Sequence, residues 1–255
     1  MAPRTARQRA GVLRLLFIAV VFVLAGVVKG VSGLGLPTVA VGLLGAAMPP
    51  AEAAALLVIP SLVTNLWQLA AGPALRSLLG RLWPLLGGIC LGTWAGSGFL
   101  SQQGSGRATM ALGAALVLYG LIGLLGPGLR VPPRAEPWLS PCAGAATGLV
   151  TAATGVFVIP AVPFLQALAL ERDELMQALG LSFTVSTLAL AADLARHGAF
   201  AASLASDSVL ALLPALLGML VGQWVRSRVQ PATFRRWFFI SLLSLGAHLI
   251  LRAAL

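Results

Sequence analysis

Charge is scarce in this chain. Only 9% of its 255 residues are Asp, Glu, Lys or Arg, whereas 58% are hydrophobic. Soluble domains carry about 25% charged residues, so this sequence has too few charges to cover a water-soluble globule. Uncharged runs recur along the chain, for example 53–75, 108–129 and 137–170. Even an 18-residue run would form a helix of roughly 27 Å, close to the thickness of bilayer hydrocarbon. We therefore predict an all-α, polytopic transmembrane protein.

Motifs for catalysis, metal binding and nucleotide binding are also missing. His197 and His248 have no partner at metal-ligand spacing, and the chain contains no GxSxG, HExxH or phosphate-binding loop. Cys90 and Cys142 lie in or beside apolar segments, and they fit neither a disulfide framework nor a metal site. We therefore expect no enzyme, no cofactor and no ATP-driven pump within this chain.

The net charge of +10 comes almost entirely from arginines between apolar runs. In a membrane protein such residues signal topology or contact lipid headgroups, so we expect a bilayer as partner and no nucleic acid. The apolar stretch 15–28 could be part of a signal peptide, but it continues into another uncharged segment and lacks a clear cleavage site, which favours a retained helix. We expect a cytoplasmic N-terminus, because first segments usually dominate topology. Arg76, Arg81, Arg130 and Arg134 would then lie inside, whereas the arginines of 226–236 would lie outside, against the rule.

Eight nominal spans are predicted, and a linker rich in Pro and Gly divides them into two homologous four-span repeats. The domains are an N-terminal repeat over 1–128, a linker over 129–137 and a C-terminal repeat over 138–255. The spans are 12–30 (continuing through a break to 47), 52–72, 82–100, 108–126, 138–169 (also broken), 174–194, 207–226 and 235–252.

Internal matches favour duplication over chance similarity of glycine-rich helices. The GxxxG of Gly26 and Gly30 has a counterpart at Gly144 and Gly148. The residues Pro84, Gly88, Gly92 and Trp94 recur 130 positions later as Pro214, Gly218, Gly222 and Trp224. Small residues one turn apart let membrane helices approach closely, so we assign these glycines to packing. Four spans per half would make the repeats parallel, whereas an extra crossing in each broken element would invert them.

Each half opens with a helix that is broken by glycine and proline. The first break contains Gly30, Gly33, Gly35 and Pro37, and the second contains Thr151, Thr154, Gly155 and Pro160. Irregular backbone is tolerated at membrane depth only inside protein or beside a cavity, so paired breaks point to a transporter site. Simple kinks repaired by neighbouring helices are the alternative.

Polar side chains gather at or near the breaks, and as a set they offer the donors that a dehydrated oxyanion needs. Any one of them could instead join helices by a hydrogen bond. The further candidates are Ser32 and Thr38 in the first break, Asn65 and Gln68 in the second span, and Ser182 and Ser186 in the sixth. Lys29, the only lysine, stands beside the first break; it would supply positive charge to a substrate, or it could extend to the membrane interface. Asp193 is a candidate for proton coupling, or for an ion pair with Arg196.

The two openings read GVVKGVSGLGLPTVAVGLLG and GLVTAATGVFVIPAVPFLQAL. With the spans that follow them, they resemble the TauE/SafE family of sulfite and organosulfonate exporters over nearly the whole chain. The resemblance implies an inner-membrane permease of about eight spans that moves sulfur-containing or carboxylate anions, usually outward. By position, the family's first glycine-rich opening corresponds to Gly30, Ser32, Gly33, Gly35 and Pro37. Its second opening corresponds to Thr151, Thr154, Gly155 and Pro160. The family's consecutive glycines are replaced here by SGLGLP and AATGVF.

These observations predict a secondary transporter that exports a small anion such as sulfite, sulfoacetate or a related organosulfonate or organic anion. The two halves would alternate access to a central site formed by the two broken helices. An anion channel and a membrane scaffold or assembly protein without transport are the alternatives. The sequence does not indicate the oligomeric state.

Overall fold

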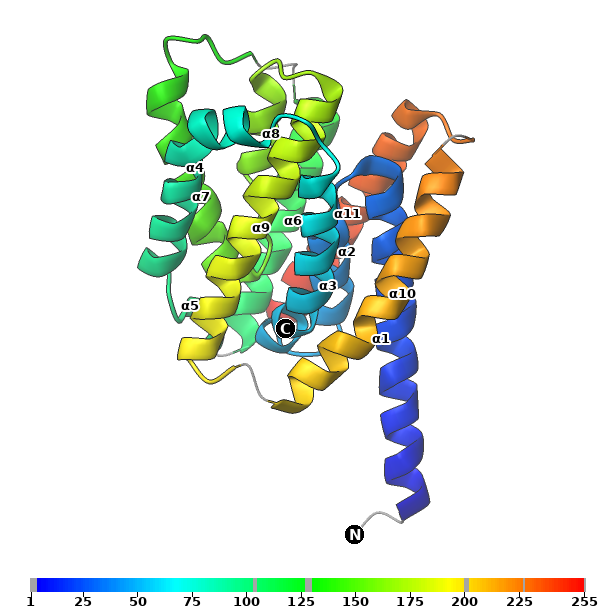
Figure 1. The fold of residues 1–255 in the computed structure, drawn as a ribbon. Helices are drawn as coiled ribbons and strands as arrows, with labels where there is room; N and C mark the ends of the chain where they lie inside the picture. Colours follow the sequence, from blue (N-terminus) through cyan, green and yellow to red (C-terminus); the bar gives the residue numbers. More distant parts are fainter. Residues whose placement is uncertain (1–3, 103–104, 127–129, 200–201, 227, 255) are drawn as a thin grey trace.

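Helices form nearly all of the chain in the computed structural model, which describes residues 4–102, 105–126, 130–199, 202–226 and 228–254 (Figure 1). No strand occurs in these ranges, so the predicted all-α class is confirmed. The helices are α1 (Arg4–Ser32), α2 (Leu36–Gly45), α3 (Pro50–Ala70), α4 (Leu75–Ala95), α5 (Phe99–Gln102), α6 (Ser105–Leu125), α7 (Glu136–Thr154), α8 (Ala161–Ala167), α9 (Arg172–Arg196), α10 (Ala202–Arg226) and α11 (Pro231–Ala254).

Six of these helices are long and apolar enough to cross a membrane. Their spanning parts are Gly11–Ser32, Pro50–Ala70, Gly106–Leu125, Arg172–Arg196, Leu204–Arg226 and Ala232–Ala254. Helices α4 and α7, with 21 and 19 residues, are not among the six. The protein is therefore a multi-pass membrane protein by length and composition, while the count of eight spans stays a prediction.

One predicted span is shifted. We expected a helix over 82–100, but α4 runs from Leu75 to Ala95. The prediction began after Arg81 because it followed the uncharged run, whereas the helix includes two arginines in its first turns. It ends before Gly98, whose φ of 84° is unfavourable for residues with a side chain.

The first break adds a traverse that separates α1 from α3. Helix α1 contacts the start of α3 through Arg14 and Glu52, whose side chains are 3.1 Å apart. Beyond the end of α1, a Cβ atom added at Gly33 would lie 3.8 Å from Gln68 Nε2, near the end of α3. Helices α1 and α3 therefore run in the same direction, and the short helix α2 returns the chain between them. We call the end of the molecule with residue 4 the N-terminal end, and the opposite end, uppermost in Figure 1, the far end.

This extra traverse changes the sidedness of several arginines. Because α3 ends at the far end, α4 starts there with Arg76 and Arg81. Arg81 pairs with Glu136 at 2.6 Å, which places the preceding segment with Arg130 and Arg134 at the same end. These four arginines therefore lie opposite the N-terminus, and our prediction that they share its side is wrong. The arginine distribution then gives no support to a cytoplasmic N-terminus.

Glycines join two pairs of parallel helices, as we predicted from their spacing. A Cβ added at Gly30 of α1 would lie only 2.2 Å from the carbonyl oxygen of Met219 in α10. In the other pair, a Cβ at Gly148 of α7 would lie 2.2 Å from the carbonyl oxygen of Ile89 in α4. Backbones this close exclude side chains and gain dispersion contacts, which drive helix association in lipid. The two contacts involve equivalent positions, since Gly148 follows Gly30 by 118 residues and Met219 follows Ile89 by 130.

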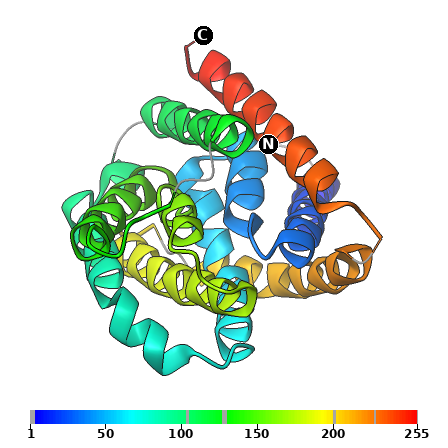
Figure 2. The same ribbon diagram turned by 90° about the horizontal axis from the view of Figure 1, so that it is seen from above.

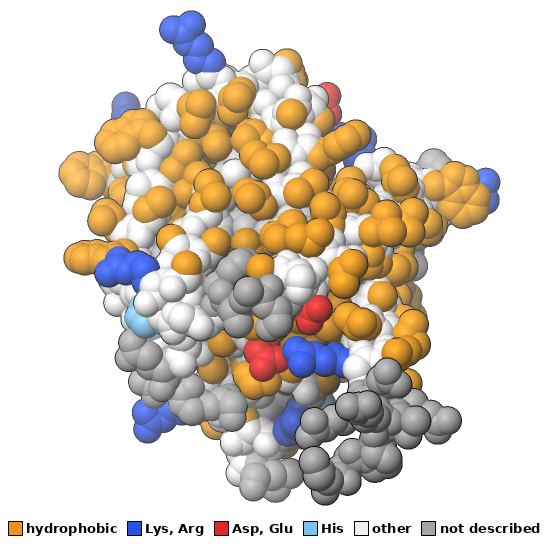
Figure 3. All heavy atoms as spheres, turned by 60° about the horizontal axis from the view of Figure 1, so that its bottom comes forward, with side chains coloured by type: hydrophobic (Ala, Val, Ile, Leu, Met, Phe, Trp, Pro, Cys, Tyr) orange, Lys and Arg blue, Asp and Glu red, His pale blue; other side chains and the backbone are white. Residues whose placement is uncertain are grey.

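The α1/α10 and α4/α7 pairs flank a middle layer that contains α2 and α3 (Figure 2). On the face drawn in Figure 3, hydrophobic side chains cover most of the surface, and only a few charged side chains lie among them. Trp83 and Trp138, on the α4/α7 pair, are 68% and 79% exposed. Such a surface suits lipid contact rather than water, as the composition predicted.

Candidate functional site

Lys29 is the one ammonium side chain in the sequence, and it is buried in the last turns of α1 with only 4% of its surface exposed. Its Nζ donates a hydrogen bond to Oδ1 of Asn65 on α3. Asn65 in turn donates from Nδ2 to Ser61 Oγ at 3.0 Å and lies 3.4 Å from Thr187 Oγ1 on α9. A polar network therefore fixes the lysine where α1, α3 and α9 meet.

The positive charge of Lys29 has no negative partner in this network. Among the described residues no carboxylate lies within ion-pair distance of Nζ; the acidic groups that form ion pairs do so elsewhere, as Glu52 does with Arg14. A buried ammonium whose hydrogen-bond acceptor is a neutral amide carries an uncompensated desolvation cost. An anion would therefore gain more from this position than from an exposed lysine.

A cavity of about 220 Å³ opens beside Lys29 at the far end. It is bounded by the last turns of α1, α3 and α10 and by the first turns of α9. Its volume is below the 300–1,000 Å³ usual for drug-sized ligands, so it suits a small ion. The lining residues are Lys29, Gly30, Gly33, Thr64, Trp67, Gln68, Ala71, Gly72, Asp173, Met176, Gln177, Met219, Gln223 and Arg226.

Four of the predicted binding residues line this cavity: Lys29, Gly30, Gly33 and Gln68. A fifth, Asn65, does not line it but forms a hydrogen bond with Lys29. Gly30 and Gly33 bring the α1 backbone to the edge, and Gln68 is tethered there because its Nε2 donates to the Met176 carbonyl at 2.9 Å. Asn65 contributes as the acceptor of Lys29. Gly33 must lack a side chain, because its φ is 74° and an added Cβ would lie only 2.1 Å from Met176 Cε.

The remaining predicted residues of the first break form hydrogen bonds with the backbone or shape the start of α2. Ser32 Oγ donates to the carbonyls of Val28 and Leu34, at 2.8 and 3.0 Å, and bridges the end of α1 to the turn. Gly35 has a φ of 93° and precedes α2, with Pro37 in its first turn. Thr38 Oγ1 donates to the Gly35 carbonyl at 3.0 Å, so this hydroxyl is not directed to the cavity.

The second break likewise satisfies its own polar groups. Thr151 and Thr154 donate to the carbonyls four residues earlier, each at 2.7 Å. Gly155 ends α7 with a φ of 72°, and Pro160 precedes α8. The structure places this break away from the Lys29 cavity, since none of its residues is among the lining.

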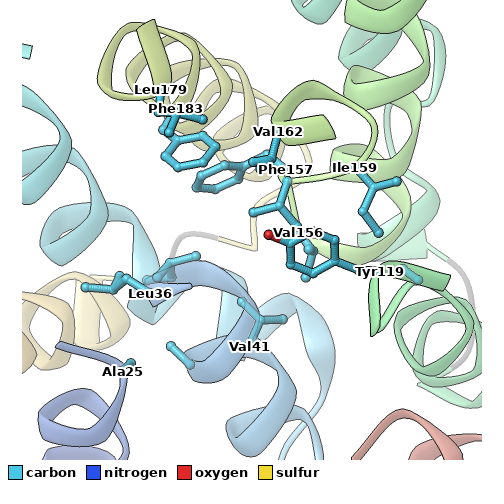
Figure 4. Close-up of a cluster of buried hydrophobic side chains, with 14 of the residues drawn as sticks. Ala25, Leu36, Val41, Tyr119, Val156, Phe157, Ile159, Val162, Leu179 and Phe183 are labelled. Carbon is cyan, nitrogen blue, oxygen red and sulfur yellow. The ribbon is translucent and has the colours of Figure 1, made fainter. Parts of the chain in front are cut away.

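An apolar cluster occupies the space where the two broken elements meet. Leu36 and Val41 of the first element lie opposite Val156 and Phe157 of the second, with Phe183 of α9 beside them (Figure 4). The ring centroids of Phe157 and Phe183 are 5.4 Å apart, and both side chains are fully buried. The breaks therefore meet at hydrophobic side chains, while the charged group lies toward the far end.

Ser182, Ser186 and Asp193 form a separate polar face on α9. The two serine hydroxyls are buried and have no hydrogen-bond partner among the described residues. Oδ1 of Asp193 accepts from Ser97 Oγ and from the Gly98 N–H at 3.2 Å, and His197 Nδ1 also lies 3.2 Å from it. The predicted alternative, an ion pair with Arg196, is not among the ion pairs of the described chain.

Several residues of the cavity escaped the sequence analysis. Gln177 Nε2 donates to the carbonyls of Leu69 and Gly72, at 2.8 and 2.7 Å, and its Oε1 accepts from the Ala74 N–H at 2.7 Å. It thereby holds α9 against the turn after α3. Gln223 lies one turn from Met219, in register with Gly30, so the α1/α10 glycine pairing could have pointed to it.

Searches of curated proteins and of solved structures returned no match to this chain. A family model does match, and it covers residues 18–249, which include both breaks, the Lys29 cavity and both glycine-joined helix pairs. The match agrees with the resemblance found in the two broken openings. The chain belongs to the sulfite exporter TauE/SafE family.

Proposed function

We propose that this protein is a secondary transporter that exports a small oxyanion, such as sulfite, sulfoacetate or a related organosulfonate, across the bacterial-type inner membrane. The observation that carries the proposal is the buried ammonium of Lys29, which lacks a carboxylate partner and borders a cavity of about 220 Å³. Its desolvation would be offset when an anion binds, and Gln68 and Gln223 offer further amide groups.

The protein is proposed to consist of two inverted repeats, which correspond to the predicted halves on either side of 129–137. The support is the equivalent glycine contacts of the α1/α10 and α4/α7 pairs. The direction of the chain agrees, because α1 starts at the N-terminal end and α7, after the segment that follows Arg130, starts at the far end. An odd number of traverses per half inverts a repeat.

Applying the repeat offsets to the cavity identifies its counterpart at the N-terminal end. Gln223 corresponds to Thr93, 130 residues earlier. The sequence VTNL at 63–66 of α3 matches VSTL at 185–188 of α9, so Thr64 corresponds to Ser186, 122 residues later. Unlike the open Lys29 cavity, this counterpart is closed: Thr93 and Ser186 are at most 2% exposed, and their hydroxyls have no partner among the described residues. Buried hydroxyls without a partner are costly. We propose that they are hydrated or bind the anion in the alternate conformation, when the far end closes.

Asp193 lies on the same face of α9 as this counterpart, and its Oδ2 has no hydrogen-bond partner among the described residues. A proton on that oxygen would neutralise a carboxylate that is only 4% exposed. We propose Asp193 as the group that couples proton movement to the exchange between the two conformations.

Flux and accessibility measurements test these proposals. Purified protein in vesicles should accelerate sulfite efflux saturably, and sulfite or sulfoacetate should raise its melting temperature. After removal of the two native cysteines, Gln68→Cys should react with an impermeant maleimide only from the far side. Ser186→Cys should react only from the other side, and an anion should change the two rates in opposite directions. Unsaturable current, or labelling of both cysteines from one side, would contradict alternating access.

A further inference from the structure

A second cavity, of about 500 Å³, lies at the far end between the last turns of α1, α6 and α10 and the first turns of α9 and α11. We call it the arginine cavity. It is more than twice as large as the Lys29 cavity, and within the range typical of sites for organic ligands. Arg226 borders both cavities, whereas Lys29 borders only the smaller one.

One wall of the arginine cavity is aromatic and fixed in place. The ring of Tyr119 meets Phe239 edge to face, with centroids 5.2 Å apart, and Phe238 lies 5.2 Å from Phe239. These three side chains are at most 8% exposed. Val31 and Ile122 extend the same wall. Rings held by such contacts present a preformed apolar surface, which favours a ligand with a hydrocarbon or aromatic part.

The opposite character comes from three arginines on three helices: Arg172 of α9, Arg226 of α10 and Arg235 of α11. Within the described chain, none of the three has a carboxylate within ion-pair distance. Asp173, although next to Arg172, borders the Lys29 cavity and not this one. Guanidinium groups bind planar and tetrahedral oxyanions through paired N–H donors. The cavity therefore offers positive charge on one side and an aromatic wall on the other.

We propose that the arginine cavity binds an anionic amphiphile, with its oxyanion head at Arg226 and Arg235 and its apolar body against Tyr119, Ile122 and Phe239. A small inorganic oxyanion would leave the aromatic wall in contact with water, and a neutral apolar molecule would leave the arginines unpaired. Only a ligand with an anionic group and an apolar part would pair with the arginines and also cover the aromatic wall. This site is distinct from the Lys29 cavity and does not depend on the function proposed for it.

Two sources could supply this chemistry: an anionic phospholipid of the surrounding bilayer, or an organic anion from the adjoining water. The cavity lies at the ends of the helices, where headgroups contact arginine and aromatic side chains. Both sources predict the same protein contacts, so the experiment needs an arm for each.

The first arm measures the affinity of delipidated protein for ethane-, butane- and hexanesulfonate by calorimetry. Each added methylene should tighten binding about four-fold, the factor for burying one CH2 group. Arg235→Gln should weaken hexanesulfonate binding by about five-fold, the upper end for an exposed ion pair. The matched control is Arg236→Gln, because Arg236 is the next residue but does not line this cavity. Ile122→Trp should fill the space and remove the dependence on chain length.

The second arm compares the phospholipid that stays bound after purification from vesicles containing phosphatidylglycerol. Retention that falls in Arg235→Gln but not in Arg236→Gln, together with displacement by hexanesulfonate, identifies the lipid source. Unchanged retention with chain-length-dependent sulfonate binding identifies a free organic anion. Either result supports the site.

The inference is overturned if affinity does not rise with chain length and phosphatidylglycerol retention is the same in both arginine variants. It is also overturned if the Arg235 and Arg236 variants behave alike in both arms. The affinities are measured with and without excess sulfite, which competes for the Lys29 cavity, so a failure of the proposed transport function is distinguished from a failure of this test. Variant melting temperatures are measured alongside, to exclude loss of folding as the cause of weaker binding.

Discussion

Replacing Lys29 by methionine should weaken anion binding at the Lys29 cavity without unfolding the protein. Methionine is unbranched and similar in length, so it occupies the same space beside the cavity and removes only the ammonium. The change leaves Asn65 Oδ1 without its donor, at a cost of about 1–3 kcal/mol if water cannot replace it. Removing a buried charge that has no carboxylate partner releases a desolvation cost of similar or larger size. We therefore expect the ligand-free melting temperature to stay within about 4 °C of the wild type or to rise.

The effect on binding should have the opposite sign. A hydrogen bond to a charged group contributes about 1.5–3 kcal/mol, so its loss weakens anion binding by about ten- to 150-fold. Lys29→Arg keeps the charge on a bulkier group and should retain part of the affinity. The assay pairs sulfite calorimetry with efflux from vesicles, and Arg14→Gln is the control that removes a positive charge from α1 at the opposite end. Normal efflux by Lys29→Met would refute the role of the ammonium in transport.

Three other substitutions test the packing, one in the α4/α7 pair and two at the Lys29 cavity. Gly88→Leu should prevent stable folding, because an added Cβ would lie 2.5 Å from a backbone oxygen of α7. The control Gly87→Leu should be tolerated, because nothing lies within 4 Å of a Cβ added there, and the yields of monodisperse protein from the two variants are compared. Gly33→Ala should destabilise by about 1–2 kcal/mol from its positive φ alone, with more from the clash at Met176, and equal melting temperatures would contradict this. Gln177→Leu removes three hydrogen bonds to the end of α3 and the turn after it, and it should lower the free energy of unfolding by about 1–3 kcal/mol. The comparison is Gln177→Glu, which has nearly the same shape, keeps the acceptor for the Ala74 N–H and loses the two donated hydrogen bonds.

The positions of the breaks were predictable because glycine and proline act locally. Gly35 has the positive φ that a residue without a side chain adopts most readily, and Gly155 ends α7 in the same way. The glycine-to-glycine helix pairs were predictable for a similar reason, since small residues one turn apart form a flat face on any helix. What the spacing did not show is which helix meets which face; α1 pairs with α10 from the other half of the chain.

The roles of the polar residues were less predictable. The hydroxyls of Thr38, Thr151 and Thr154 matched the pattern of a binding set, yet each donates to a carbonyl of its own helix or turn. A threonine can form that local bond in almost any helix, and the sequence carries no signal for which option it takes. Asn65, 36 residues from Lys29, accepts its hydrogen bond because α2 turns the chain back between α1 and α3.

The sequence by itself determined the membrane class, the helical fold, the two broken openings and the family, because hydropathy, glycine and proline act over a few residues and leave a pattern in the chain. The tertiary structure decided that α2 forms an extra traverse, which sets the direction of every later helix and the end at which each arginine lies. It also decided that the ammonium of Lys29 borders a cavity toward the far end while hydrophobic side chains fill the meeting point of the breaks. These features depend on contacts between distant segments, and such contacts are set by the packing of whole helices rather than by any local pattern.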